Sequence, residues 1–205
     1  MIENKILVIS GPTGSGESTV TNKIIEKYPI FQRLITSTTR KPRSNEKNQV
    51  DYYFFTEEEF KKQREQGNIL EYTYIENRGV YYGTYLPDLN EKLIKGHVIV
   101  NVDHIGLKFY KKNYKAISIF IKPESLEIIK ERLKKRNPEM TEEELMNRLK
   151  NAQDEIDSEE RFYDHIVFNK QGKLEEAVQE IEEILRKENY LTGLTISHIN
   201  SRIRR

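Results

Sequence analysis

The chain has 205 residues, enough for one sizeable α/β domain with a small inserted lobe but hardly for two independent cores. Its 34 basic and 33 acidic residues nearly cancel, so no overall field favours nucleic acid or an acidic membrane surface. The absence of cysteine excludes disulfides, thiol chemistry and cysteine-ligated zinc. With no signal-peptide pattern and no apolar run long enough for a membrane span, we expect a cytoplasmic protein that binds neither nucleic acid nor membrane. The sequence does not indicate which proteins, if any, bind to this one.

The first predicted element is a buried parallel strand over residues 5–10, because the run is continuously apolar and rich in β-branched residues. A glycine-rich turn follows, and then residues 17–28 show the apolar spacing of a helix that Pro29 ends. This order of strand, glycine-rich turn and helix is typical of a phosphate-binding P-loop.

The turn matches the pattern G-x-x-x-x-G-K-[ST] except at the lysine, where the chain has Glu17. In such a loop the backbone N–H groups surround the phosphates of ATP, and the Ser18 hydroxyl contacts the Mg²⁺ that accompanies ATP. A plain alternative is a tight turn between a strand and a helix without a ligand. The residues predicted to bind the ATP phosphates are Gly11, Thr13, Gly14, Ser15, Gly16, Ser18 and Thr19.

Residues 38–85 are predicted to form a small mixed lobe. Residues 31–36 lead into it as a strand or extended connection, and residues 38–49 form a polar, basic loop. An aromatic strand over 51–55 precedes a helix that begins after Thr56 and ends near Gln66. Two short strands, 69–75 and 80–85, complete the lobe.

The remaining chain alternates helices and strands. Helices are expected over 87–94, 125–137, 141–160 and 174–187, and buried strands over 97–102, 116–121 and 165–168. Residues 190–205 have weak periodicity and a basic end, and are expected to be a loosely attached tail. The pattern predicts an α/β fold of the P-loop NTPase type, a parallel sheet with helices on both faces.

Four segments resemble, in order and spacing, the nucleoside-monophosphate lobe of guanylate kinases. They are T-S-T-T-R-K-P-R at 36–43, V-D-Y-Y-F at 50–54, L-E-Y at 70–72 and Y-Y-G-T at 81–84. The resemblance covers nearly all of residues 5–187. It implies one domain over 1–189, with a core of 1–37 and 86–189, a GMP-binding lobe over 38–85, and a helical lid near 132–150.

In the lobe, Arg40 and Arg43 flank a proline and could grip a monophosphate in bidentate fashion. Glu71 is an acceptor that matches the donor edge of guanine at N1 and N2. A plain alternative for the basic loop is a solvated turn. The residues that the resemblance assigns to GMP are Thr36, Ser37, Arg40, Arg43, Tyr52, Glu71, Tyr82, Thr84 and Asp103.

On the ATP side, the resemblance identifies Arg132, Arg136 and Arg148 as lid arginines, with Arg40, Arg136 and Arg148 acting in catalysis beside the altered position Glu17. The plain alternative for the lid arginines is exposed helix charge paired with Glu131 or Glu144. Asn169 matches a position near the ATP base. Asp103 matches an acid near Mg²⁺ or its waters, although Asn101 stands where the family usually has another acid.

Two functions from different classes follow. In the first, the protein is a guanylate kinase that transfers a phosphoryl group from ATP, bound with Mg²⁺, to GMP, giving ADP and GDP. Glu17 then either slows this reaction or has its effect compensated by other residues. In the second, it is a catalytically silent guanylate-kinase-like protein that binds GMP or a phosphorylated partner. An engineered change at Glu17 in an ordinary kinase is a third interpretation.

Overall fold

The computed structural model describes residues 4–191, apart from the Asn77 side chain. The chain forms two compact units. The first consists of Met1–Ile6 and Ile30–Ala116, and the second of Leu7–Pro29 and Ile117–Arg205. In residues 4–191, no helix combines the length and the apolar composition needed to cross a membrane.

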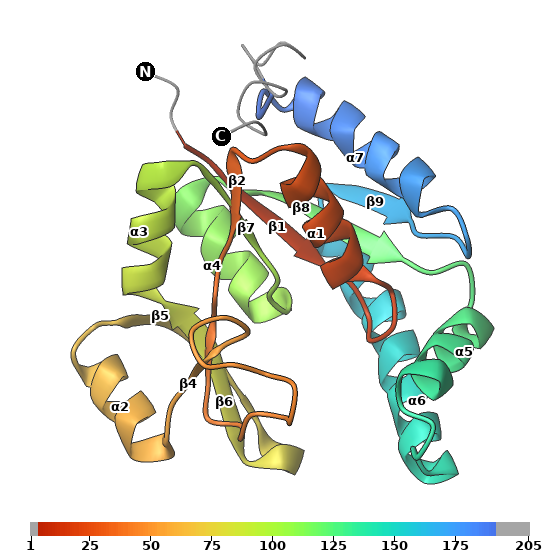
Figure 1. The fold of residues 1–205 in the computed structure, drawn as a ribbon, viewed down its shortest axis with the longest axis horizontal. Helices are drawn as coiled ribbons and strands as arrows, with labels where there is room; N and C mark the ends of the chain where they lie inside the picture. The colour runs from red at the N-terminus through yellow and green to blue at the C-terminus, as the bar shows by residue number, and fades with distance from the viewer. Residues whose placement is uncertain (1–3, 192–205) are drawn as a thin grey trace. The chain divides into compact units, whose positions relative to one another are not determined.

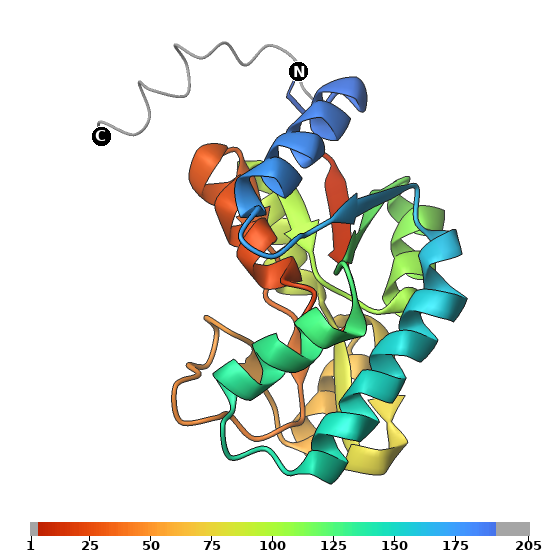
Figure 2. The same ribbon diagram turned by 90° about the vertical axis from the view of Figure 1, so that its right-hand side faces the viewer.

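The second unit is built on a parallel ladder of three strands. Strand β1 (Ile6–Ser10) pairs with β8 (Ile117–Lys122), and β8 pairs with β9 (His165–Phe168). All five residues of β1 are buried, which confirms the strand predicted from its unbroken apolar run. Helices α1 (Glu17–Lys27) and α7 (Leu174–Lys187) pack against each other (Figure 2), and α7 buries one face that contains Ala177, Ile181 and Leu185.

Two further helices of this unit, α5 (Leu126–Arg136) and α6 (Glu142–Glu159), form a helical pair with its own small core. The break between them falls at Asn137 and Pro138, as predicted, because proline cannot continue a helix. The side chains of Ser125 and Thr141 accept hydrogen bonds from backbone N–H groups in the first turns, so both helices have N-caps. The pair packs through Ile129, Leu133, Leu145 and Ala152, and a short 3-10 turn, Glu160–Phe162, follows α6.

The first unit contains a parallel pair of strands, β2 (Phe31–Arg33) and β7 (His97–Val100), and the helices α3 (Leu86–Lys95) and α4 (His104–Tyr114). Helix α4 was not predicted. Its N-cap is Asp103, which the resemblance assigns to GMP and to Mg²⁺ or its waters; the Asp103 carboxylate accepts hydrogen bonds from the backbone N–H groups of Ile105 and Gly106, both at 3.0 Å. A glycine and three aromatic residues within the helix weaken its propensity signal.

A mixed sheet with strand order β4-β3-β6-β5 forms the rest of the first unit (Figure 1). Its strands are β3 (Ser37–Thr38), β4 (Tyr53–Phe54), β5 (Ile69–Ile75) and β6 (Val80–Tyr85). Pairs β3–β6 and β5–β6 are antiparallel, and β3–β4 is parallel. Helix α2 (Glu57–Glu65) starts with the predicted cap at Thr56, which forms a reciprocal capping box with Glu59. A 3-10 turn, Glu76–Arg78, joins β5 to β6.

The prediction of a loosely attached tail from residue 190 is wrong for its first two residues. Tyr190 and Leu191 are buried, and the Tyr190 hydroxyl accepts a hydrogen bond from the backbone N–H of Ile117 at 3.4 Å. Burial raises the pKa of the Tyr190 phenol to about 12, so it stays neutral. The remainder of the predicted tail, residues 192–205, lies outside the described residues.

Candidate nucleotide-binding sites

The glycine-rich turn of the second unit has the backbone that its sequence requires. Gly14 and Gly16 have φ values of 82° and 93°, a region in which a Cβ atom is strained. At Gly11 a Cβ atom would lie 2.4 Å from the carbonyl oxygen of Ile121, so only glycine fits there as well. The Ser15 N–H donates to the carbonyl of Pro12 at 2.9 Å and closes the turn before α1 begins.

Arg132 and Asn169 hold this turn from outside. Nη1 of Arg132 donates to the carbonyl oxygens of Gly14 and Ser15 at 3.1 and 2.9 Å, and Nη2 donates to the carbonyl of Asn169 at 3.0 Å. The Asn169 amide donates to the same Ser15 carbonyl at 2.8 Å. Burial lowers the pKa of the Arg132 guanidinium, but a group with so high an ordinary value remains charged. A positive charge therefore lies against the glycine-rich turn.

The first turn of α1 carries Glu17, Ser18 and Thr19. Gly16 is the N-cap and offers no side chain, so the exposed N–H groups and the positive end of the helix dipole face the turn. A carboxylate at Glu17 is favourable for that helix end, for the same reason that a phosphate would be. Glu17 and a bound phosphate would thus compete for one electrostatic environment.

Arg136 and Arg148, the other two arginines predicted to belong to the lid, have different surroundings from Arg132. Arg148 on α6 donates twice to the Glu144 carboxylate, at 3.1 and 2.7 Å, which is the helix pairing considered as its plain alternative. Arg136 is an exposed residue at the end of α5. Their roles toward ATP remain predictions.

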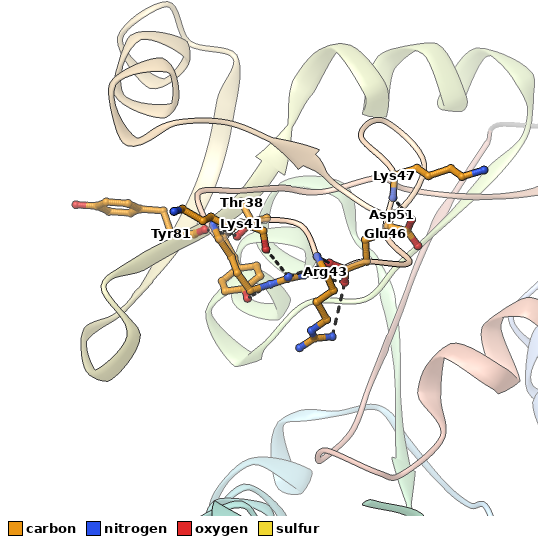
Figure 3. Close-up of polar contacts among 9 residues, drawn as sticks. Thr38, Lys41, Arg43, Glu46, Lys47, Asp51 and Tyr81 are labelled. Carbon is orange, nitrogen blue, oxygen red and sulfur yellow. Dashed lines mark hydrogen bonds and ion pairs between the residues drawn. The ribbon is translucent and has the colours of Figure 1, made fainter. Parts of the chain in front are cut away.

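In the first unit, Arg40 forms a bidentate pair with Glu46. Nη1 and Nη2 each lie 2.8 Å from a carboxylate oxygen of Glu46, and only 17% of the Arg40 side chain is exposed. Glu46 also accepts from the backbone N–H of Arg43 at 2.8 Å, while the Arg43 guanidinium lies 3.6 Å away and is mostly exposed. Figure 3 shows Arg43 and Glu46 side by side on this loop. The pair raises the pKa of Arg40 and lowers that of Glu46, so both stay charged.

Two tyrosines surround the Arg40 guanidinium. Its Nε donates to the Tyr82 hydroxyl at 3.2 Å, and its Cζ lies 5.4 Å from the centre of the Tyr52 ring. Tyr81, the neighbour of Tyr82 on β6, points to the opposite side of the sheet (Figure 3), as strand alternation requires. Of the residues predicted to bind the monophosphate, Arg40, Tyr52 and Tyr82 are thus in mutual contact, and Arg43 is linked to Arg40 through Glu46.

Glu71 lies on β5 beside Thr84 of β6. The Thr84 hydroxyl donates to the Glu71 carboxylate at 2.6 Å and also lies 2.8 Å from the Tyr110 hydroxyl. Burial raises the pKa of Glu71 from 4.5 to about 7, and the charge of Asp103 adds to this effect. Glu71 is therefore an acceptor whose charge state changes near neutral pH.

The hydroxyls predicted to contact guanine are placed unequally. The Thr84 and Ser37 side chains are fully buried, and Ser37 donates to the carbonyl of Gly83 at 2.9 Å. Thr36 is only partly buried. Asp103 is exposed and caps α4 with one of its oxygens. Of the three hydroxyls, Thr36 is thus the most accessible, and the contacts of all three with guanine remain predictions.

The comparisons with known proteins decide the family. The model of the family described as guanylate kinase matches residues 3–188. The chain belongs to the guanylate kinase family. It is 36% identical over 192 residues to a guanylate kinase of Wolbachia pipientis wMel, covering 91% of both chains, and 40% identical over 185 residues to one of Clostridium perfringens (strain 13 / Type A), covering 89% of this chain and 83% of that one.

A solved structure of the family supports the fold. The crystal structure of guanylate kinase from Anaplasma phagocytophilum matches with a TM-score of 0.68 and 32% identity, covering 90% of this chain and 86% of that one. The predicted α/β fold with parallel strands and packed helices is confirmed. The chain is thus a member of a family of nucleoside monophosphate kinases in both sequence and fold.

Three residues of these sites were missed from the sequence. Glu46 follows Arg43 by three residues, and an acid in a basic loop could have suggested an internal counter-ion. Tyr110 lies on the unpredicted helix α4. Asp88 is buried on α3, where it accepts from the Ile35 N–H at 2.9 Å and binds Lys92, and no local pattern distinguishes it from a surface carboxylate.

Proposed function

We propose that this protein is a guanylate kinase that transfers the terminal phosphoryl group of ATP to GMP, giving ADP and GDP. The observation that carries the proposal is the arrangement in the first unit, where Arg40, Tyr52 and Tyr82 meet on one face and Glu71 supplies a carboxylate. A guanidinium suits a phosphate dianion, and a carboxylate suits the N1 and N2 donors of guanine. The family membership supports the same reaction.

The proposed GMP residues all belong to the first unit, and the proposed ATP residues all belong to the second. In the second unit, ATP would bind through the N–H groups of the glycine-rich turn and the lid arginines, with Asn169 near its base. Mg²⁺ would arrive with ATP and keep phosphate and water ligands, and the Ser18 hydroxyl is the oxygen that the second unit would add. Phosphoryl transfer depends mainly on such positioning and on cationic cover.

Glu17 occupies the position of the P-loop lysine, and we expect it to weaken ATP binding. Replacing the lysine removes a positive charge and adds a negative one; at about 4 Å and an effective dielectric near 20, each unit-charge pair contributes roughly 4 kcal/mol. Lys23 does not take the place of this lysine, because its ammonium group is bound to Glu26 at 3.1 Å. Arg132, whose guanidinium already contacts the turn, is the proposed compensating charge.

The second candidate is a silent guanylate-kinase-like protein that binds GMP or a phosphorylated partner, and Glu17 is the feature that favours it. The domain boundaries that we propose are a kinase domain over 1–189, with a GMP-binding lobe over 38–85 and a lid near 132–150, followed by a tail. Both candidates share the GMP site. They differ in whether the second unit still uses ATP.

The test compares the unchanged chain with Glu17→Lys. Calorimetric titrations with GMP and with ATP and Mg²⁺ are combined with an assay that couples ADP release to a signal. We expect GMP to bind both forms equally, and ATP binding and turnover to rise at least tenfold in the variant. Equal turnover by both forms would show that Glu17 is tolerated and that our electrostatic account is wrong. Turnover by neither form, with GMP bound by both, would favour the silent protein.

A further inference from the structure

Tyr110 is a buried polar residue for which the family resemblance gives no role. It lies on α4, its side chain is fully buried, and its hydroxyl is 2.8 Å from the hydroxyl of Thr84. Burial raises the pKa of the phenol far above the physiological range, so the group stays neutral and keeps its single proton. A buried hydroxyl of this kind costs stability unless it is hydrogen bonded.

The direction of the Tyr110 hydrogen bond follows from the hydroxyl that it meets. Thr84 has one proton, and it donates that proton to the Glu71 carboxylate at 2.6 Å. While Glu71 is ionised, the Thr84 oxygen can therefore only accept from Tyr110. The protons point in sequence from Tyr110 to Thr84 and from Thr84 to Glu71, and each donation strengthens the next.

This chain of hydrogen bonds sets the state in which Glu71 meets a ligand. Burial and the negative charge of Asp103 on the α4 side favour a protonated Glu71, and the Thr84 hydroxyl on β6 opposes them. A protonated Glu71 could instead donate to Thr84, which would leave guanine N1 and N2 facing a poorer acceptor. While Tyr110 donates to Thr84, the Thr84 proton is directed toward Glu71 and holds the carboxylate in the accepting form.

We infer that Tyr110 is a positioning residue for guanine recognition, which acts through Thr84 to keep the Glu71 carboxylate oriented and able to accept hydrogen bonds from the base. The inference rests on the proposed function, because it assumes that Glu71 binds guanine. It adds a residue on α4 to a site otherwise built from the mixed sheet. It also predicts that Tyr110 affects the choice of base more than the binding of phosphate.

The experiment compares Tyr110→Phe with the unchanged chain and with Tyr190→Phe. Tyr190 is the matched control because it is also buried and its hydroxyl also takes part in a hydrogen bond, but in the second unit. Calorimetry measures the Kd for GMP and for IMP, which lacks the 2-amino group. For Tyr110→Phe we expect about fivefold weaker GMP binding, a smaller loss for IMP, and hence a reduced preference for GMP. Tyr190→Phe should leave both values unchanged.

A second measurement separates positioning from a general loss of structure. The titration of the Glu71 carboxyl, followed by NMR with carbon-13-labelled glutamate and assigned with Glu71→Gln, should move to higher pH in Tyr110→Phe and stay in place in Tyr190→Phe. An unchanged GMP to IMP preference together with an unchanged Glu71 titration would overturn the inference. If the unchanged chain itself fails to bind GMP, it is the proposed function that fails. If Tyr110→Phe unfolds, Thr84→Val interrupts the same chain of hydrogen bonds, and an unmoved Glu71 titration in that variant would overturn the inference.

Discussion

Replacing Glu71 by glutamine should stabilise the protein and abolish its recognition of guanine. The carboxyl has a folded-state pKa of about 7 against an ordinary value of 4.5, so the folded state binds the proton more tightly than the unfolded state. Stability is therefore lost as pH rises from about 4.5 to about 7. At roughly 1.4 kcal/mol per pKa unit, the charged side chain costs about 3–4 kcal/mol above this range.

Glutamine keeps the size of the side chain and an oxygen that can accept from Thr84, but it carries no charge. We expect the free energy of unfolding of Glu71→Gln to exceed that of the unchanged chain by about 3–4 kcal/mol at pH 8, and by almost nothing at pH 4. Urea denaturation followed by circular dichroism across this pH range measures the difference. Glu58→Gln, an exposed substitution on α2, controls for the loss of one negative charge.

The same variant should bind GMP at least tenfold more weakly, because its amide presents a donor beside the guanine donors. A stabilisation that does not depend on pH, or one that grows toward acid pH, would refute the reasoning. So would GMP binding at the strength of the unchanged chain. The expected outcome is the exchange of stability for function that is common at binding sites.

Three further outcomes can be checked. Gly16→Ala places a Cβ atom 2.3 Å from the Asn169 amide at a φ of 93°, and should lower stability by about 1–3 kcal/mol in urea denaturation and weaken ATP binding. Asp88→Asn removes a buried charge that pairs with the partly buried Lys92 and should cost at least about 2 kcal/mol, measured as a lowered Tm, with Glu91→Gln at an exposed ion pair as the control. Arg40→Lys replaces a guanidinium that can hold a phosphate through two N–H groups by an ammonium group that cannot, and should weaken GMP binding about tenfold or more in calorimetry. An unchanged Kd for GMP would exclude Arg40 as the phosphate ligand.

Local pattern was sufficient to predict most of the fold. Strand β1, the turn with its glycines and helix α1 follow from periodicity and backbone constraints that act within a few residues. The caps at Thr56, Ser125 and Thr141 belong to the same class of local signal. Helix α4 was missed because its aromatic residues and glycine weaken propensity, while its burial is decided by tertiary packing.

The site residues divide in the same way. Arg40, Tyr82 and Glu71 could be singled out from the sequence because they lie within motifs of fixed spacing, and their roles stay predictions. The contacts that position the groups could not, because they join distant segments: Arg132 and Gly14 are 118 residues apart, and Thr84 and Tyr110 are 26 apart. The bidentate attachment of Glu46 to Arg40 likewise requires a loop conformation that charge alone does not specify.

The division of the proposed nucleotide residues between two units means that the two affinities can change separately. A change at residue 17 would alter only the unit to which ATP is assigned, and would leave the hydrogen bonds around Arg40 and Glu71 intact. A guanylate kinase that lost the P-loop lysine could therefore still bind GMP after its rate of phosphoryl transfer had declined. For the same reason, a single change of residue 17 to lysine could raise kinase activity without any change in the lobe that is proposed to bind GMP.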